Sequence, residues 1–287
     1  MQEKISLSIE NGVDLYLCYK GQSEWRALEK EAQSLDLLNS AFLAEISTKG
    51  FIEPITGIRH KPGAFNLDIQ NLHETISARG LNSRKRALLF VIRRVLGDAG
   101  LWDKRNIRIL SADGISRIAL IMRGIFPFFL GTEYLPSEKE RSNFFPIVHM
   151  DLCNIEFKNE SFDMFMSADV LEHVPNLDLA IKNIFETLRP GGFFVSSFPF
   201  SPARSTTIVK ALINESGNLE HILEPEYHGN PVDPESGSLV FSLPGWDILS
   251  NLRDIGFREA YFASVSSARY GILSNNRFGP FVLVAEK

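Results

Sequence analysis

The stretch SFDMFMSADVLEHVPNLDLAIKNIFETLRPGGFFVSSFPF, Ser161 to Phe200, contains the pattern that decides the fold. Met164–Ala168 and Phe193–Phe198 are apolar runs of strand length, and between them Leu177–Leu188 carries apolar residues at helical spacing. Two apolar strands joined by a helix of this length predict a right-handed crossover in a parallel sheet. Ligands of such sheets bind beyond the carboxyl ends of the strands, so the residues after Ala168 are predicted to lie at a site.

Similar strand-length and helix-length patterns flank this unit on both sides. Their alternation predicts a doubly wound α/β domain with a mostly parallel sheet. The predicted strands are Ile107–Leu110, Phe128–Leu130, Ile147–Met150, Phe257–Val265 and Pro280–Ala285, and the predicted helices are Arg117–Arg123 and Trp246–Asp254.

Residues 1–100 are predicted to form a largely helical extension or cap in front of this domain, which spans residues 101–287. Their patterns favour a strand at Val13–Tyr19 and helices over Ser23–Ser47 and from Ser83 to Val95. The sequence leaves open whether this extension folds by itself or packs over the sheet.

The strand and helix pattern lapses between residues 201 and 245. An irregular loop of this length inside a compact domain is uncommon unless it is functional, so we interpret it as a lid insertion. Thr206–Asn214 is predicted to be a short helix within it. The run HILEPEYHGNP, which begins at His221, is rich in side chains that can contact a substrate.

The composition is that of a globular protein, with 23% charged and 44% hydrophobic residues and a formal net charge of -5. A negative total disfavours non-specific nucleic-acid binding, because that binding requires a positive surface. The N-terminus lacks a basic-then-apolar signal pattern, and no apolar run approaches the roughly 20 residues that cross a bilayer. We therefore expect a cytoplasmic protein without a membrane span.

Three pieces of the central stretch carry a resemblance to a known family: Ser161-Phe162-Asp163, Asp169-Val170-Leu171-Glu172-His173-Val174 and Leu188-Arg189-Pro190-Gly191-Gly192. In this order and at this spacing they resemble the second half of a class I S-adenosylmethionine-dependent methyltransferase of the type 11 kind. The resemblance implies a Rossmann-like methyltransferase fold with a seven-stranded sheet, S-adenosylmethionine as cofactor, and an acceptor substrate. A second resemblance, of residues 80–87 to a segment of bacterial proteins linked to glycan modification, adds saccharides to the small molecules as possible acceptors.

Acidic residues follow or end three successive predicted strands, at Glu133, Asp151 and Asp169. A carboxylate at the tip of a second strand can accept hydrogen bonds from both hydroxyls of a ribose, which gives this role to Glu133, with Tyr134 along the adenine. We predict that Asp151 accepts from the adenine amino group, that Leu152 packs near the ring, and that Asp169 lies near the methionine portion. The alternative for each carboxylate is a cap of a turn or of a helix start.

The loop after the first predicted strand departs from the family pattern, which the resemblance implies to be an acidic residue followed by a glycine-rich turn. Ser111 replaces the acid, and Ala112 or Asp113 replaces the first glycine. Gly114 remains, and Asp113 can substitute for the missing acid. We predict that this loop binds the methionine portion of the cofactor. The alternative is a catalytically silent methyltransferase fold that serves as a binding or scaffold module.

The sulfonium methyl group is already electrophilic, so catalysis mainly requires alignment of the acceptor, and a base is needed where the acceptor is a hydroxyl. The histidines therefore favour O-methylation, and His228 is the preferred base because it lies in a predicted turn that can close over the site. The alternative for each histidine is a structural role. The predicted catalytic residues are His228, His173 and Tyr227, and the lid residues predicted to bind substrate are His221 and Asn230.

Arg84 and Arg86 lie in the predicted helix that starts at Ser83. Guanidinium groups match planar anions with two parallel hydrogen bonds, so both are candidates to bind a phosphate or carboxylate of the substrate. The alternative is a solvated helix face, because charged side chains are mostly exposed.

Asp169, Glu172 and His173 also resemble the acidic-acidic-His signature with which some quinone-pathway methyltransferases hold a divalent ion. We expect no bound metal, because the usual role that the resemblance implies is to shape the floor of the site near the methyl group. The sequence therefore predicts methyl transfer from S-adenosylmethionine to a small-molecule or glycan-linked acceptor.

Overall fold

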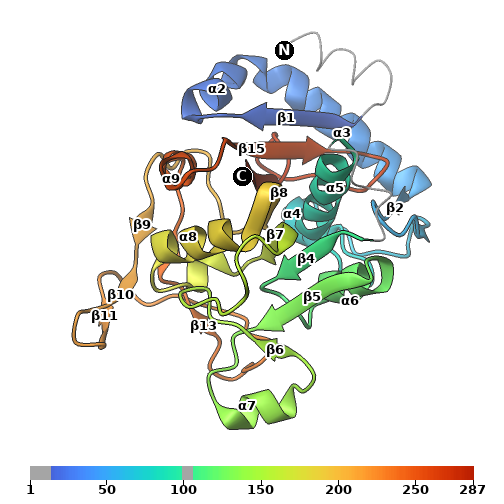
Figure 1. Cartoon of the computed structure of the whole chain (residues 1–287). Helices are drawn as coiled ribbons and strands as arrows, with labels where there is room; N and C mark the ends of the chain where they lie inside the picture. Colours follow the sequence, from blue (N-terminus) through green and yellow to red (C-terminus); the bar gives the residue numbers. More distant parts are fainter. Residues whose placement is uncertain (1–13, 99–105) are drawn as a thin grey trace. The chain divides into compact units, whose positions relative to one another are not determined.

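The computed structural model describes residues 14–98 and 106–287 (Figure 1). The chain divides into two compact units, which we call the N-terminal unit and the central unit. The N-terminal unit combines Met1–Asp103 with Tyr261–Leu283, and the central unit combines Lys104–Ala260 with Val284–Lys287. The predicted boundary near residue 100 did not include the return of Tyr261–Leu283 to the N-terminal unit.

The central unit contains a sheet of five parallel strands: β4 (Arg108–Ser111), β5 (Phe128–Glu133), β6 (Val148–His149), β7 (Phe162–Ala168) and β8 (Leu188–Ser197). Their order is β8-β7-β4-β5-β6, and every neighbouring pair is parallel. Nearly all of β7 is buried, which explains why most of its residues are apolar. The predicted parallel crossover is therefore confirmed.

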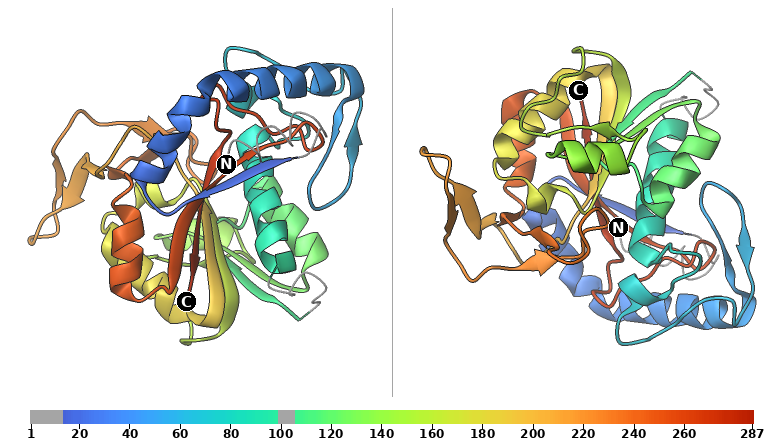
Figure 2. Two further views of the ribbon diagram at one scale, coloured as in Figure 1. Left: turned by 90° about the horizontal axis from the view of Figure 1, so that it is seen from above. Right: turned by 90° about the horizontal axis from the view of Figure 1, so that it is seen from below.

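Helices cover this sheet on both sides: α6 (Arg117–Ile125), α8 (Leu177–Thr187) and α9 (Ile248–Ile255). α6 begins at Ser116, whose hydroxyl oxygen accepts hydrogen bonds from the backbone N–H groups of Ile118 and Ala119. It packs against β5, whereas α8 packs against β7, β8 and α9. Figure 2 shows α8 and α9 on one side of the strands and α6 on the other, as a doubly wound sheet requires.

Three further strands are β1 (Leu15–Tyr19), β15 (Glu259–Ser266) and β16 (Phe281–Glu286). β1 belongs to the N-terminal unit, whereas β15 and β16 each contain residues of both units. β1 is antiparallel to β15. The predicted doubly wound, mostly parallel sheet is confirmed by the five parallel strands of the central unit.

The N-terminal unit is largely helical, as predicted. Its elements are α2 (Gln22–Ala27), the 3-10 helix η1 (Leu28–Glu31), α3 (Ala32–Lys49), α4 (Leu72–Thr75), α5 (Ser83–Asp98) and the short strands β2 (Phe51–Ile52) and β3 (Arg59–His60). The turn at η1 divides the single helix predicted over Ser23–Ser47. Within the described ranges, no helix combines the length and the apolar character needed to cross a membrane.

Arg86 on α5 is fully buried within the N-terminal unit. Its guanidinium lies 4.2 Å from the centre of the Phe51 ring. It donates hydrogen bonds to four backbone carbonyl oxygens, those of Ile76, Leu81, Tyr270 and Gly271. Burial lowers the pKa of Arg86 to about 9, which leaves the group charged at neutral pH. This side chain joins distant segments of one unit, so the prediction that it binds a substrate anion is corrected.

Three two-stranded ribbons form much of residues 201–245, and we call this segment the lid. They pair β9 (Ile208–Val209) with β14 (Ser242–Leu243), β10 (Ala211–Ile213) with β11 (Leu219–His221), and β12 (Tyr227–His228) with β13 (Ser238–Leu239). The helix predicted over Thr206–Asn214 was therefore wrong. The base of the lid is fixed by Asp247, which accepts hydrogen bonds of 2.8 Å from the N–H and the hydroxyl of Thr207.

We predict that Arg86→Met lowers the free energy of unfolding by about 3–5 kcal/mol, because the substitution leaves four buried carbonyl groups without their charged donor. The matched control is Arg84→Met, since Arg84 is partly exposed and pairs with Glu74. The control is expected to cost no more than about 1 kcal/mol. Urea unfolding followed by circular dichroism measures both changes. Equal losses in the two variants would contradict the role assigned to Arg86.

Candidate functional site

The carboxyl edge of the parallel sheet has a switch point at β4. β4 lies between β5 and β7. The chain therefore adds β5 and β6 on one side of β4 and then returns to add β7 and β8 on the other side. Ser111, the last residue of β4, is in register with Gly131 and Met166. The residues just after these positions therefore meet at one edge, where ligands of doubly wound sheets bind.

The loop that follows β4 is closed by its own hydrogen bonds. The Ser111 hydroxyl donates to the Asp113 carbonyl oxygen at 2.8 Å, and the Asp113 carboxylate accepts from the backbone N–H of Ser116 at 3.0 Å. Ser111, Ala112 and Asp113 are all buried. The Asp113 carboxylate therefore binds the start of α6, a contact that the sequence did not predict.

Gly114 is the position of the loop where a side chain does not fit. A Cβ atom on Gly114 would lie 2.8 Å from the carbonyl carbon of Gly131, so the loop approaches the backbone of β5 closely. The N–H of Gly114 donates a 3.0 Å hydrogen bond to Glu133 Oε1. The first loop and the end of β5 are therefore in direct contact.

Glu133 ends β5 with a partly buried carboxylate. Burial raises the pKa of Glu133 to about 7, and the hydrogen bond from Gly114 opposes this rise. Tyr134, the next residue, is 59% exposed and its ring lies 5.7 Å from that of His149. A carboxylate with a pKa near neutrality beside an exposed aromatic ring offers an acceptor and a stacking surface to a nucleoside.

The two other acidic strand ends have different local roles. Asp151, two residues beyond β6, accepts a 2.8 Å hydrogen bond from the N–H of Cys153, and the adjacent Leu152 is buried. Asp169, directly after β7, has a φ of 56°, a conformation that residues other than glycine adopt rarely. Such backbone strain is found preferentially at functional sites.

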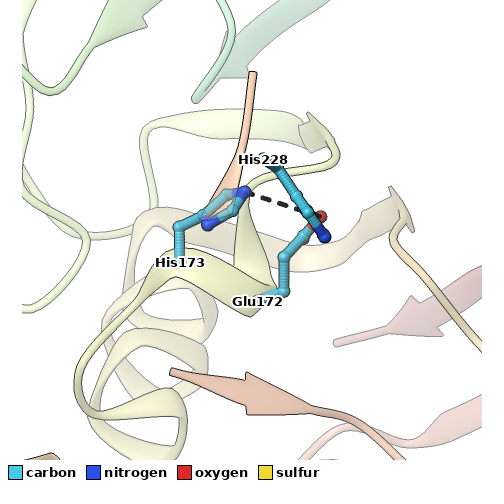
Figure 3. A group of neighbouring side chains, drawn as sticks. All are labelled: Glu172, His173 and His228. Carbon is cyan, nitrogen blue, oxygen red and sulfur yellow. Dashed lines mark ion pairs between the residues drawn. The ribbon is translucent and has the colours of Figure 1, made fainter. Parts of the chain in front are cut away.

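Beyond β7, the 3-10 helix η2 (Leu171–His173) brings Glu172 and His173 beside His228 of β12 (Figure 3). Glu172 is fully buried, and the side chains of His173 and His228 are 16% and 30% exposed. Glu172 Oε1 lies 3.8 Å from His173 Nε2 and 3.7 Å from His228 Nδ1. We call these three side chains the Glu-His-His cluster.

The outer nitrogen of each imidazole is bonded to an acceptor. His173 Nδ1 lies 2.8 Å from the carbonyl oxygen of Leu239, and His228 Nε2 lies 3.1 Å from Glu226 Oε1. Carbonyl and carboxylate oxygens only accept, so both outer nitrogens carry the hydrogen. Lys210 Nζ in turn donates to Glu226 Oε2 at 2.5 Å. The Glu172 carboxylate, followed by Glu226, raises the pKa of His228.

The lid is fastened to η2 at the cluster. In addition to the Leu239 contact, the N–H of Phe241 donates a 2.8 Å hydrogen bond to the carbonyl oxygen of Glu172. These bonds place His228 over the end of β7. The sequence singled out His173 and His228 separately, whereas Glu226, Lys210 and the burial of Glu172 were missed because only tertiary contacts bring them together.

The remaining predicted residues lie outside this cluster. Tyr227 neighbours His228 in β12 and is 56% exposed, and His221 is exposed on β11. The Asn230 side chain accepts a 2.8 Å hydrogen bond from the N–H of Val232. Arg84 lies in the N-terminal unit, paired with Glu74.

Several solved structures are similar to this chain. A Mesorhizobium loti S-adenosylmethionine-dependent methyltransferase is 18% identical, with 70% of this chain and 98% of that chain covered and a TM-score of 0.41. A possible histamine N-methyltransferase of Thermotoga maritima is 14% identical, with coverages of 70% and 90% and a TM-score of 0.37. Phosphoethanolamine N-methyltransferase 2 of Haemonchus contortus, in complex with S-adenosyl-L-methionine, is 14% identical, with coverages of 73% and 54% and a TM-score of 0.41. Among curated proteins, nothing matches.

A family model described as a methyltransferase domain matches residues 131–196. This segment extends from the end of β5 through β6 and β7 to β8, and it includes η2 with two members of the Glu-His-His cluster. Residues 131–196 are therefore similar to part of a methyltransferase domain, and the cofactor that the sequence resemblance implies for such a domain is S-adenosylmethionine.

The donor and acceptor chemistry of the carboxyl edge fits this cofactor. Ribose hydroxyls and the adenine amino group are hydrogen-bond donors, and the strand ends of the central unit present carboxylates, which accept. When bound, the cofactor supplies an electrophilic methyl group. The residues of the chain have to hold it, orient the acceptor and take up a proton where the acceptor is a hydroxyl.

Proposed function

We propose that this methyltransferase transfers the methyl group to a hydroxyl of a small-molecule or glycan-linked acceptor. The observation that carries the proposal is the pair of imidazoles, His173 and His228, that the lid and η2 bring together beyond β7. A hydroxyl acceptor requires removal of its proton, and histidine is the side chain best suited to this task near neutral pH. An amine acceptor that is already unprotonated needs no such group.

His228 is the proposed base. It is the more exposed of the two imidazoles, and Glu226 holds its ring in one orientation. The raised pKa of His228 makes the imidazolium that forms after proton transfer more stable. His173 lies at 5.1 Å between ring centres and is the second candidate, while the exposed Tyr227 is a third.

The cofactor is proposed to lie along the strand ends. Glu133 accepts from the ribose hydroxyls with Tyr134 along the adenine, and Asp151 accepts from the adenine amino group beside Leu152. The loop Ser111, Ala112, Asp113 and Gly114, together with Asp169, lies near the methionine portion. Support comes from the register of β5, β4 and β7, which brings these positions to one edge of the sheet. We also propose that the lid covers the acceptor, with His221 and Asn230 as lid contacts.

Binding of the cofactor is tested by thermal unfolding. S-adenosylmethionine at about one hundred times its dissociation constant is expected to stabilise the protein by roughly 2.7 kcal/mol. Asp151→Ala is expected to weaken binding about tenfold or more through loss of a charged acceptor, with the fold intact. The control is Asp178→Ala, because Asp178 is an exposed acid of α8. Unchanged affinity in Asp151→Ala would refute its placement, and no shift for the wild-type chain would favour a silent scaffold.

Cofactor affinity is expected to fall roughly tenfold between pH 8 and pH 6, because protonation of Glu133, with its pKa of about 7, removes an acceptor from the ribose hydroxyls. The sign follows from the raised pKa: the carboxylate is ionised above pH 7 and neutral below it. Isothermal titration across this range measures the profile. Glu133→Gln provides the control for titration of the cofactor itself, and an identical profile in this variant would exclude Glu133.

Substitution of His228 by alanine is expected to reduce the rate of methyl transfer about 100-fold to 10,000-fold, with cofactor affinity unchanged. Transfer of a labelled methyl group to a panel of hydroxyl and amine acceptors measures this effect. Tyr227→Phe is the companion variant, and a comparable loss there would give the phenol a role. Efficient transfer to an amine with no loss in His228→Ala would overturn O-methylation.

A further inference from the structure

The Glu-His-His cluster directs three electron-pair donors at one another. Because the outer nitrogens of His173 and His228 carry the hydrogens, the inner nitrogens, Nε2 of His173 and Nδ1 of His228, have lone pairs in the neutral rings. Both face Glu172 Oε1, at 3.8 Å and 3.7 Å. These distances exceed a hydrogen bond, so the three atoms surround a point without bonding to each other.

The burial of the Glu172 carboxylate makes this arrangement energetically unfavourable. The side chain is fully buried, and in the described part of the chain neither of its carboxylate oxygens has a hydrogen-bond partner. A buried carboxylate without hydrogen bonds is strongly unfavourable unless a positive charge compensates it. Lys210 does not supply that charge to Glu172, because its ammonium group bonds Glu226 on the far side of His228. The cluster therefore needs a positive charge beside Glu172, which a bound cation or a proton on an imidazole supplies.

We propose that Glu172, His173 and His228 bind a divalent first-row transition-metal ion of the zinc type. Their ligand atoms all lie within 4.8 Å of one another. Two ligands held about 2.1 Å from a tetrahedral ion are roughly 3.4 Å apart, so the two distances between Glu172 and the imidazoles need to shorten by only a few tenths of an ångström. Imidazole and carboxylate together suit zinc and its neighbours better than magnesium, which prefers oxygen ligands alone.

The surroundings of the cluster match those of a metal centre. Metal-binding histidines usually donate their second N–H to a carbonyl or a carboxylate, which fixes the ring and the tautomer. His173 donates to the Leu239 carbonyl oxygen and His228 donates to Glu226. Three protein ligands leave a fourth position open, as in catalytic rather than structural zinc sites. The sequence led us to expect no metal from the usual role of the Glu172-His173 motif, and it gave no sign that His228 lies beside these residues.

An ion at this position would deepen the proposed function. The inference rests on that function only for its catalytic consequence: a hydroxyl that occupies the open position would lose its proton more readily, since a bound divalent ion lowers the pKa of an oxygen ligand. In this state His228 Nδ1 is a ligand, and the proton leaves to solvent or to another base. Metal binding itself does not depend on the acceptor.

The test is metal titration of the untagged, full-length protein after treatment with a chelator. Calorimetry with Zn²⁺ and visible absorption with Co²⁺ are expected to show one ion per chain. His173→Ala and His228→Ala are each expected to reduce the affinity at least 100-fold, and Glu226→Gln, which weakens the hydrogen bond that orients His228, about 10-fold to 100-fold. His221→Ala is the matched control for metal affinity, because it removes an exposed lid histidine outside the cluster. Circular dichroism verifies that each variant is folded.

The outcomes separate this inference from the proposed function. No binding at millimolar Zn²⁺ and Co²⁺, or unchanged affinity in both His173→Ala and His228→Ala, overturns the metal site, and a proton then balances Glu172. The thermal shift with S-adenosylmethionine, measured on the same chelator-treated sample, reports the cofactor site independently. Metal binding that follows the predicted order of variants supports the inference even where no methyl transfer is found.

Discussion

The parallel pairing of β4 with both β5 and β7 is the constraint on which the rest of the central unit depends. Because the chain continues from β4 to β5 on one side and the sheet continues to β7 on the other, α6 and α8 cover opposite faces and leave the carboxyl edge open. Because of this strand order, residues that are far apart in the sequence meet at the carboxyl edge of the sheet. The candidate site residues therefore lie on loops and at strand ends, whereas the strands between them are mostly apolar.

In the N-terminal unit, irregular segments link the helices and the short ribbon. The backbone carbonyl groups of these segments need hydrogen-bond donors. One buried guanidinium, that of Arg86, supplies four of them. A neutral side chain could not satisfy so many acceptors from one position, and the Phe51 ring beneath the cation offsets part of its desolvation. This accounts for the burial of one charged residue in the first turn of α5.

The sequence predicted the elements whose burial is uniform. β7 and β8 contain the apolar runs Met164–Met166 and Phe193–Val195, and α8 has a single apolar face, so period and length identify them. The ribbons of the lid were not predicted, because strands of two or three residues are too short to show a periodic apolar pattern. Their pairing partners are also distant in the sequence. Arg86 was misinterpreted for a related reason: nothing in a helical pattern indicates that four carbonyl groups surround one of its charged positions.

For the same reason, the Glu-His-His cluster could not be predicted from the sequence alone. Its motif, Asp169 to His173, is local and was recognised, but the charge state of the site depends on His228 and Glu226, which the lid delivers. Because Phe241 and Leu239 bond to η2, the lid cannot leave without exposing the Glu172 carboxylate to water and separating the two imidazoles. The position of the lid and the electrostatic environment of Glu172 are therefore coupled. A ligand that stabilises the charge on Glu172 also holds the lid in place, and a substrate that displaces the lid loses the group proposed to accept its proton.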